Sequence, residues 1–345
     1  MTPRERVLAA IEHQSPDRIP CDLWAEPGVW ERLRRRLGVR TEDEVRAALQ
    51  VDVRYLSPRH PPDTVINGVR QNAWGERWEK TSTVYGVEWE HTRGALYDAQ
   101  SVADLEAFPW PTCDQVDYSA IAEEARRYEG HAIFCGNADF FERPGLVRGL
   151  ENILVDVIEN PEMVEYLEER FLTFFIEDFH RTMEAANGKV DAFLALTDLG
   201  TQDRLLMGRD AMERFIFAPL RRLAHVVHAE GVRLLFHSCG AVREVIPDLI
   251  ACGVDILNPL QPAAKGMEPS GLKRDFGRDV AFHGGIDIQY VLPVKTPQEV
   301  RAEVRRVAGI LGQQGGYVLS ASHNIQQDTP TENILAMYDP EARRL

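Results

Sequence analysis

Short runs of apolar, β-branched and aromatic residues alternate with longer amphipathic stretches along most of the chain. The short runs have the length of a buried strand, and the longer stretches repeat apolar positions with helical spacing. Eight runs are predicted as strands: Ile19–Trp24, Asp52–Ser57, His131–Asn137, Asp191–Asp198, Val232–His237, Asp255–Pro259, Asp279–Gly284 and Gly316–Ser322. Because strands and helices alternate, the pattern predicts a parallel sheet with helices packed against it.

Helix-start signals support the intervening stretches. Thr2, Pro3 and Glu5 form a predicted capping box with proline at the first helical position, and Thr329–Glu332 repeats that pattern near the end of the chain. Helices are also predicted at Val29–Leu37, Glu42–Leu49, Ser119–Tyr128, Gly145–Glu159, Pro161–Asn187, Arg209–Glu230, Val242–Cys252 and Thr296–Gln314.

Eight strands separated by helices predict a (β/α)8 TIM barrel, formed by residues 1–345 as a single domain. Residues 59–117 are rich in Trp, Gly and Pro and are too many for a plain connection, so they are predicted as an insertion between strands two and three. Within it, Arg77–Glu90 alternates around a central glycine, as a hairpin does. An open doubly wound sheet is the alternative, but no Gly-x-Gly-x-x-Gly follows the first strand.

Composition narrows the class of protein. The chain is 44% hydrophobic and 27% charged, which is typical of a globular protein. Its net charge of −15 argues against a nucleic-acid partner, because phosphate binding needs a basic face. No targeting segment or membrane span is visible. The five cysteines are odd in number and scattered, which indicates a reducing, cytoplasmic setting.

Polar residues gather where the predicted strands end, and in a barrel this is the face that carries the active site. His237 and Cys239 end the fifth strand, two residues apart, so on a strand both face one cavity. His323 follows the eighth strand. Imidazole and thiolate are ligands that zinc prefers, and three of them with an open fourth position describe a catalytic zinc site. The alternative is a buried cysteine with two hydrogen-bonded histidines.

Other strand-end residues are candidates for substrate binding or catalysis. Asp198 is read as a fourth ligand, a partner that orients a histidine, or an N-cap. Gly284 and Gly285 expose backbone N–H groups that suit a carboxylate or phosphate, although they also fit a tight turn. The remaining candidates for substrate contact are Asn137, Gln202, Gln261, His283, Asp287 and Asn324.

The chain resembles the uroporphyrinogen decarboxylase superfamily, which includes zinc-dependent methylcobamide methyltransferases. The resemblance is carried by five stretches: Met1–Leu8, His237–Gly240, Gly253–Gln261, Phe282–Asp287 and Ser322–Asn333. The methyltransferase branch has His-x-Cys and a distant Cys as zinc ligands. Here His237 and Cys239 match the first two, and His323 occupies the place of the third.

The decarboxylase branch also has a histidine at the position of His323, so that residue does not separate the branches. That branch further carries an Arg-x-Ala-Gly-Arg stretch and a catalytic Asp after the second strand. This chain reads Ile19–Pro27 and Leu56–Arg59 at those places, with neither feature.

The resemblance therefore implies a zinc-dependent methyltransferase that moves a methyl group between methylcobalamin and a small donor or acceptor. Asp178-Phe-His180 lies in a predicted helix and lacks the glycine that follows a corrinoid-ligand Asp-x-His, so a partner protein is expected to supply the corrinoid. A homodimer is left open. The alternatives are a decarboxylase of a porphyrinogen or other carboxylic acid, and a metal-free binding protein or inactive paralogue.

Overall fold

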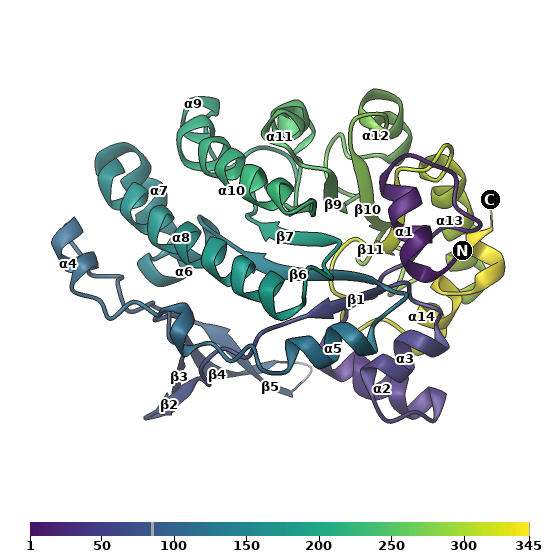
Figure 1. The fold of residues 1–345 in the computed structure, drawn as a ribbon, viewed down its shortest axis with the longest axis horizontal. Helices are drawn as coiled ribbons and strands as arrows, with labels where there is room; N and C mark the ends of the chain where they lie inside the picture. The colour runs from purple at the N-terminus through teal and green to yellow at the C-terminus, as the bar shows by residue number, and fades with distance from the viewer. Residues whose placement is uncertain (84–85, 345) are drawn as a thin grey trace.

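Seven parallel strands form a curled sheet in the computed structural model, which describes residues 1–83 and 86–344 (Figure 1). Their order in the sheet is β1-β6-β7-β8-β9-β10-β11, which follows the order along the chain. Since all are parallel, their C-terminal ends lie on one rim. The bounds are β1 (Val53–Leu56), β6 (Ala132–Ala138), β7 (Ala192–Leu196), β8 (Arg233–His237), β9 (Ile256–Leu260), β10 (Ala281–Ile286) and β11 (Tyr317–Ala321).

Most of the helices connect successive strands and cover the outer face of the sheet, whereas α1 (Pro3–Ile11) precedes the first strand and packs inside the curl (Figure 1). The others are α2 (Pro27–Leu37), α3 (Glu42–Ala48), α4 (Val102–Glu106), α5 (Ile121–Arg127), α6 (Glu142–Arg148), α7 (Leu150–Glu159), α8 (Pro161–Ala185), α9 (Arg209–Met212), α10 (Ala218–Ala229), α11 (Ile246–Cys252), α12 (Pro269–Phe276), α13 (Pro297–Leu311) and α14 (Thr331–Met337). None of the described helices is long and apolar enough to cross a membrane.

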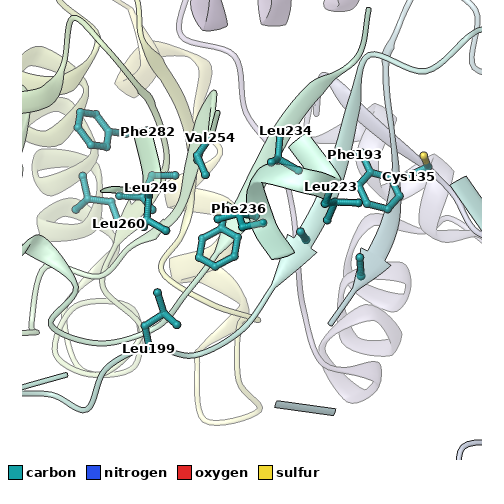
Figure 2. Packing of buried hydrophobic residues seen from close by; sticks show 14 of the residues in the cluster. Cys135, Phe193, Leu199, Leu223, Leu234, Phe236, Leu249, Val254, Leu260 and Phe282 are labelled. Atoms are coloured by element: carbon teal, nitrogen blue, oxygen red, sulfur yellow. The ribbon is translucent and has the colours of Figure 1, made fainter. Parts of the chain in front are cut away.

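Alternation along the strands divides the apolar residues between two cores. One set lines the inside of the curl, where Val7 and Ile11 of α1 pack against strand residues. These inward residues are Val53, Ala132, Phe134, Ala192, Leu235, Ile256, Ala281 and Val318. Their neighbours, such as Leu234 and Phe236, point outward into the larger core beneath the helices (Figure 2). Each strand is thus apolar on both faces, which is why its sequence reads as a continuous apolar run.

The prediction of the first strand needs correction. Residues Ile19–Trp24 form single bridges instead of a regular strand, from Cys21 to Leu319 and from Ala25 to Ile325. The segment still joins the two ends of the sheet. The N–H of Asp22 donates to Leu319 O at 2.9 Å, and the N–H of Asp52, just before β1, donates to Cys21 O at 2.9 Å. Pro20 has no N–H to donate, which shortens the ladder.

Residues between β1 and β6 build a second, antiparallel sheet with the order β2-β3-β4-β5. Its strands are β2 (Thr64–Ile66), β3 (Val69–Gln71), β4 (Arg77–Thr83) and β5 (Gly86–His91). β4 and β5 pair as the predicted hairpin, whose Val84 and Tyr85 lie outside the described residues. Arg59 and Asp117 exchange both backbone hydrogen bonds, so the segment starts and ends at one point.

Two helix predictions need correction, and one is confirmed. The single helix expected over Gly145–Glu159 is two, because Gly149 adopts φ +96° and breaks it between α6 and α7. The capping box expected at Thr329 does not form: Pro330 is the N-cap of α14, without a side-chain cap. Thr2 and Glu5 do form theirs at the start of α1.

Candidate metal centre

A polar layer lies directly above the inward apolar residues. Side chains alternate along a strand, so the residue two places after an inward-facing apolar residue also faces inward. On four strands this residue is polar. These residues are Tyr55, His237, Asn258 and His283. β8 and β9 pair in register, with Leu235 opposite Ile256 and His237 opposite Asn258. The strands therefore bring polar side chains distant in sequence into one layer at the C-terminal end of the sheet.

Hydrogen bonds join this layer into one buried chain. His237 Nδ1 lies 2.5 Å from Asn258 Oδ1, and Asn258 Nδ2 lies 2.6 Å from His283 Nδ1. His283 Nε2 lies 3.1 Å from Asp22 Oδ2, which also accepts the hydroxyl of Tyr55. All but Tyr55 are at most 8% exposed. Burial opposes ionisation of Asp22, but the hydrogen bonds from His283 and Tyr55 outweigh it and hold the pKa of this carboxyl below its ordinary value.

The carboxylate at one end sets the direction of every bond. Asp22 accepts only, so His283 donates from Nε2 and its Nδ1 accepts from the amide of Asn258. The amide oxygen of Asn258 then accepts the Nδ1 proton of His237. His237 Nε2 is left with a free lone pair, the state in which a histidine binds a metal.

That nitrogen meets two other metal ligands. Ligand atoms of His237, Cys239 and His323 all lie within 4.8 Å of one another, and His237 Nε2 is 3.6 Å from Cys239 Sγ. For tetrahedral zinc, bonds of ~2.0–2.1 Å to nitrogen and ~2.3 Å to sulfur place such ligands roughly 3.6 Å apart. The donor set fits zinc, and the three residues predicted from sequence do converge.

The convergence does not arise by the strand alternation assumed for it. β8 ends at His237, and Cys239 belongs to the loop beyond it. The loop is fixed by backbone contacts: Ser238 N–H donates to Asn258 O at 2.7 Å, and Gly240 N–H donates to the side-chain oxygen of Gln261 at 2.8 Å. Gly240 has φ +89°, and a Cβ there would lie 2.2 Å from Gly200 O, so only glycine fits.

Asp198 supports the loop from the end of β7. Its Oδ1 accepts the backbone N–H of Cys239 at 2.8 Å and lies 3.8 Å from His237 Nε2. It is not in the group of three whose ligand atoms converge. The carboxylate positions the cysteine and adds negative charge beside the ligand set.

Burial perturbs the titration of the centre. It lowers the pKa of His237 to about 4, with His323 acting in the same direction and Asp198 against it. Burial and then Asp198 raise the pKa of the Cys239 thiol well above its ordinary value. A metal cation would reverse that effect, because it stabilises the thiolate it binds. Burial, and then the charges of Asp139 and Asp198, raise the pKa of Glu142 to about 7.

The centre opens into a cavity of about 440 Å³. Aromatic and aliphatic side chains form most of its wall, and the indole of Trp24 stacks on the imidazole of His237 with ring centroids 6.0 Å apart. The lining residues are Leu23, Trp24, Ala25, Trp30, Arg46, Tyr55, Asn137, Glu142, Leu194, Leu196, Asp198, His237, His323 and Asn324. The volume is in the range of small-molecule sites.

Only some of the predicted substrate contacts reach this cavity. Asn137 and Asn324 line it, whereas His283 is fully buried beneath it. Gln261 holds the loop at Gly240, and the backbone carbonyl of Gln202 accepts from Lys265 N–H outside the cavity.

The two glycines and Asp287 lie elsewhere. Gly284 and Gly285 belong to β10 itself, with φ +111° and +92°, where the pairing with β9 shifts register. A Cβ on Gly284 would lie 3.0 Å from Leu260 N, so close strand packing explains that glycine. Asp287 accepts the N–H of Gln289 at 2.8 Å and caps the turn after β10.

Several residues of the site were not predicted. No sequence pattern assigned a role to Asp22 or Asn258, although alternation from Ile256 places Asn258 on the same face of its strand. Trp24, Trp30, Arg46 and Glu142 lie on helices or irregular segments, where no local pattern points to a cavity.

Comparisons with known proteins show the family and the fold of the chain. The family model described as Uroporphyrinogen decarboxylase (URO-D) matches residues 145–342, which contain all three metal-ligand candidates. A uroporphyrinogen decarboxylase from Anaeromyxobacter sp. (strain Fw109-5) is 29% identical over 134 residues, or 39% of this chain and 36% of that protein. The enzyme of the same name from Anaeromyxobacter dehalogenans (strain 2CP-C) is 27% identical over 139 residues, with the same coverage.

The match thus spans 36% of the length of these curated relatives. Among solved structures, a methyltransferase from Methanosarcina mazei superposes with a TM-score of 0.71 at 17% identity, covering 98% of this chain and 97% of that one. The structural likeness shows a shared fold over nearly the whole chain. The family match over more than half of the chain places it in the uroporphyrinogen decarboxylase (URO-D) family.

Proposed function

We propose that this protein is a cytoplasmic, zinc-dependent methyltransferase that moves a methyl group between a corrinoid and a small substrate. The corrinoid is methylcobalamin or its demethylated form, carried to the cavity mouth by a partner protein. The observation that carries the proposal is the convergence of His237, Cys239 and His323, of which the two histidines line a small-molecule cavity. The likeness of the fold to a methyltransferase supports it.

Zinc held by these residues would supply a Lewis acid that lowers the pKa of a bound thiol or hydroxyl and leaves it a better nucleophile. The chain's own residues prepare the site for this. Asn258 keeps the proton of His237 on Nδ1, and Asp198 holds the backbone at Cys239. Trp24 and the leucines of the wall give the cavity an apolar surface beside the centre. Glu142, with its pKa near neutrality, is placed to hold or release a proton within the cavity.

Decarboxylation is the second candidate, because the curated relatives carry the name uroporphyrinogen decarboxylase. A substrate with several carboxylates needs several cations to bind it. Arg46 is the one basic residue among the described residues that line the cavity, apart from the histidines of the centre. The charge of the wall therefore favours a smaller substrate and methyl transfer.

The test is spectral. Purified protein with measured zinc content is incubated with methylcobalamin and a panel of thiols, tetrahydrofolate and methoxylated compounds, and conversion to cob(I)alamin is followed. Zinc-dependent conversion that is lost in Cys239→Ala but kept in Cys135→Ala supports the proposal. Cys135 is a matched control, because it is a buried free cysteine on β6 outside the cavity. Loss of carboxylates from uroporphyrinogen, with no reaction of the corrinoid, would establish the decarboxylase instead.

We also propose that the sheet closes as a (β/α)8 barrel in a single domain. Residues 19–25 take the place of the eighth strand, and residues 59–117 form an insertion. The hydrogen bonds from this segment to Leu319 on one side and Asp52 on the other support it. Closure predicts slow hydrogen exchange at the amides of Asp22, Leu319 and Asp52, similar to that of β8. Exchange as fast as in exposed loops would refute the closed barrel.

A further inference from the structure

A second cavity, of about 280 Å³, lies beside helix α8 and the loops that flank the antiparallel sheet. Its wall comes from the end of β1, from residues 60–63, 72–74 and 111–116 of the segment between β1 and β6, and from α6 and α8. Asn137 at the end of β6 lines both this cavity and the one at the metal centre. The remaining lining residues differ, so the two cavities are neighbours that meet at Asn137.

A buried carboxylate faces this second cavity without a fixed cation. Asp178 of α8 is 6% exposed, and its Oδ1 accepts the hydroxyl of Tyr118 at 2.6 Å. Within residues 1–83 and 86–344, no lysine, arginine or histidine nitrogen lies within 4.0 Å of its oxygens. Burial raises the pKa of Asp178, which is the sign of a carboxylate whose charge is poorly compensated.

The basic groups whose charges act on Asp178 are His60 and Arg181, and Arg181 is already paired with Asp114 at 2.7 Å and Glu177 at 2.5 Å. Burial lowers the pKa of His60 and so opposes its protonation, whereas the charge of Asp178 raises it and the charge of Arg143 lowers it. Arg143 itself lies 3.2 Å from Glu76, whose side chain is only 4% exposed, so its charge is compensated there.

Aromatic rings form the rest of the wall. Trp74 packs edge-on to Phe174 with centroids 4.7 Å apart, and lies 6.0 Å from Phe175. The ring of His60 lies 6.1 Å from Phe174. A carboxylate beside indole and phenyl rings is the combination that binds organic cations, since ring faces attract positive charge and the carboxylate pairs with it.

We propose that this cavity binds a small alkylammonium ion, with its nitrogen near Asp178 and its carbons against Trp74, Phe174 and Phe175. The volume admits a molecule of only a few heavy atoms. The side chains of Ser57 and Asn137 lie in the same wall and offer hydrogen-bonding groups to an N–H donor or a polar substituent. The site needs no metal, so it stands or falls independently of the methyltransferase proposal.

The competing explanation is an internal ion pair, in which His60 takes up a proton and serves as the counter-ion of Asp178. The test is isothermal titration at pH 8 with n-butylammonium chloride, with 1-butanol as the neutral analogue and potassium chloride to match the ionic strength. We expect the ammonium ion to bind at least about tenfold more tightly than the alcohol. Equal affinities would support the internal pair and overturn the proposal.

Variants locate the site. Asp178→Asn should abolish the preference for the ammonium ion, whereas Asp63→Asn should keep it. Asp63 lines the same cavity but is paired with Arg70 at 3.4 Å, which makes it a matched control. Phe174→Leu keeps the charge of Asp178 and removes one aromatic ring from the wall, so it should weaken binding of the ammonium ion more than binding of the alcohol. This variant also tests the site if Asp178→Asn fails to fold. Unchanged ammonium affinity in Asp178→Asn or in Phe174→Leu would contradict the site.

Discussion

His237 and Asn258 lie opposite each other on paired strands, and their side chains meet at 2.5 Å between Nδ1 and Oδ1. The strand register that packs Leu235 against Ile256 in the apolar core is the same register that joins these two polar groups one layer higher. Because Asn258 is itself held by His283, the proton of His237 is fixed on Nδ1 and Nε2 faces the other ligands. The core and the metal centre are therefore positioned by one set of strand pairings.

Asn258→Ala should weaken zinc binding about 10–100-fold without changing the ligands, because the orientation and tautomer of His237 are no longer fixed. Zinc affinity is measured by competition with a chromogenic chelator. Asn333→Ala is the control: Asn333 is equally buried, at 1% exposed, but binds the carbonyls of Leu292 and Lys295 away from the site. Equal zinc affinity in the two variants would show that Asn258 has no positioning role.

His323→Cys should retain about one zinc per chain, whereas His323→Ala should lose most of it. A thiolate replaces imidazole as a zinc ligand, but two remaining ligands form an incomplete set. Elemental analysis of the purified variants measures the stoichiometry. His225, which lies on α10 outside the converging group, gives the matched control His225→Ala. Full zinc content in His323→Ala would remove this residue from the ligand set.

Gly240→Ala should lower the melting temperature far more than Gly188→Ala. Both glycines have positive φ, +89° and +72°, so each alanine incurs a similar backbone cost of about 1–2 kcal/mol. Only at Gly240 would the new Cβ also meet backbone, 2.2 Å from Gly200 O, whereas nothing lies within 4 Å of it at Gly188. Thermal unfolding followed by circular dichroism checks the order, and similar losses would contradict the close approach of the two loops.

Glu168→Gln should remove a pH-dependent loss of stability. Glu168 of α8 is 8% exposed with Oε2 unpartnered, and burial followed by the charge of Glu169 raises its pKa from 4.5 to about 8. Between those values the unfolded chain has released the proton and the folded chain keeps it. The free energy of unfolding therefore falls as pH rises from about 4.5 to 8.

Above pH 8 the variant should melt a few degrees higher than the wild type, and below pH 4.5 the difference should vanish. Melting curves across this range measure it. Glu184→Gln, exposed on the same helix, is the control and should leave the pH profile unchanged. A wild-type profile with no decline relative to Glu168→Gln between these pH values would mean that Glu168 ionises normally.

Local patterns in the sequence predicted the strands from Asp52 onward to within a few residues, because a run buried on both faces is continuously apolar. They also placed His237, Cys239 and His323 at one rim, since parallel strands end together. They failed at Ile19–Trp24, where pairing depends on partners almost 300 residues away, and at Gly149, whose φ breaks a helix that the apolar periodicity continues.

By itself, then, the sequence determined which segments form strands and helices and which residues offer metal-ligand atoms. The tertiary structure decided what those atoms do. It placed Asn258 and Asp198 behind two of the ligands, left His283 beneath the cavity, and put Asp178 into a second cavity built from a distant segment. Hydrogen bonds and burial depend on contacts between residues far apart along the chain, and no local periodicity encodes which of these residues meet.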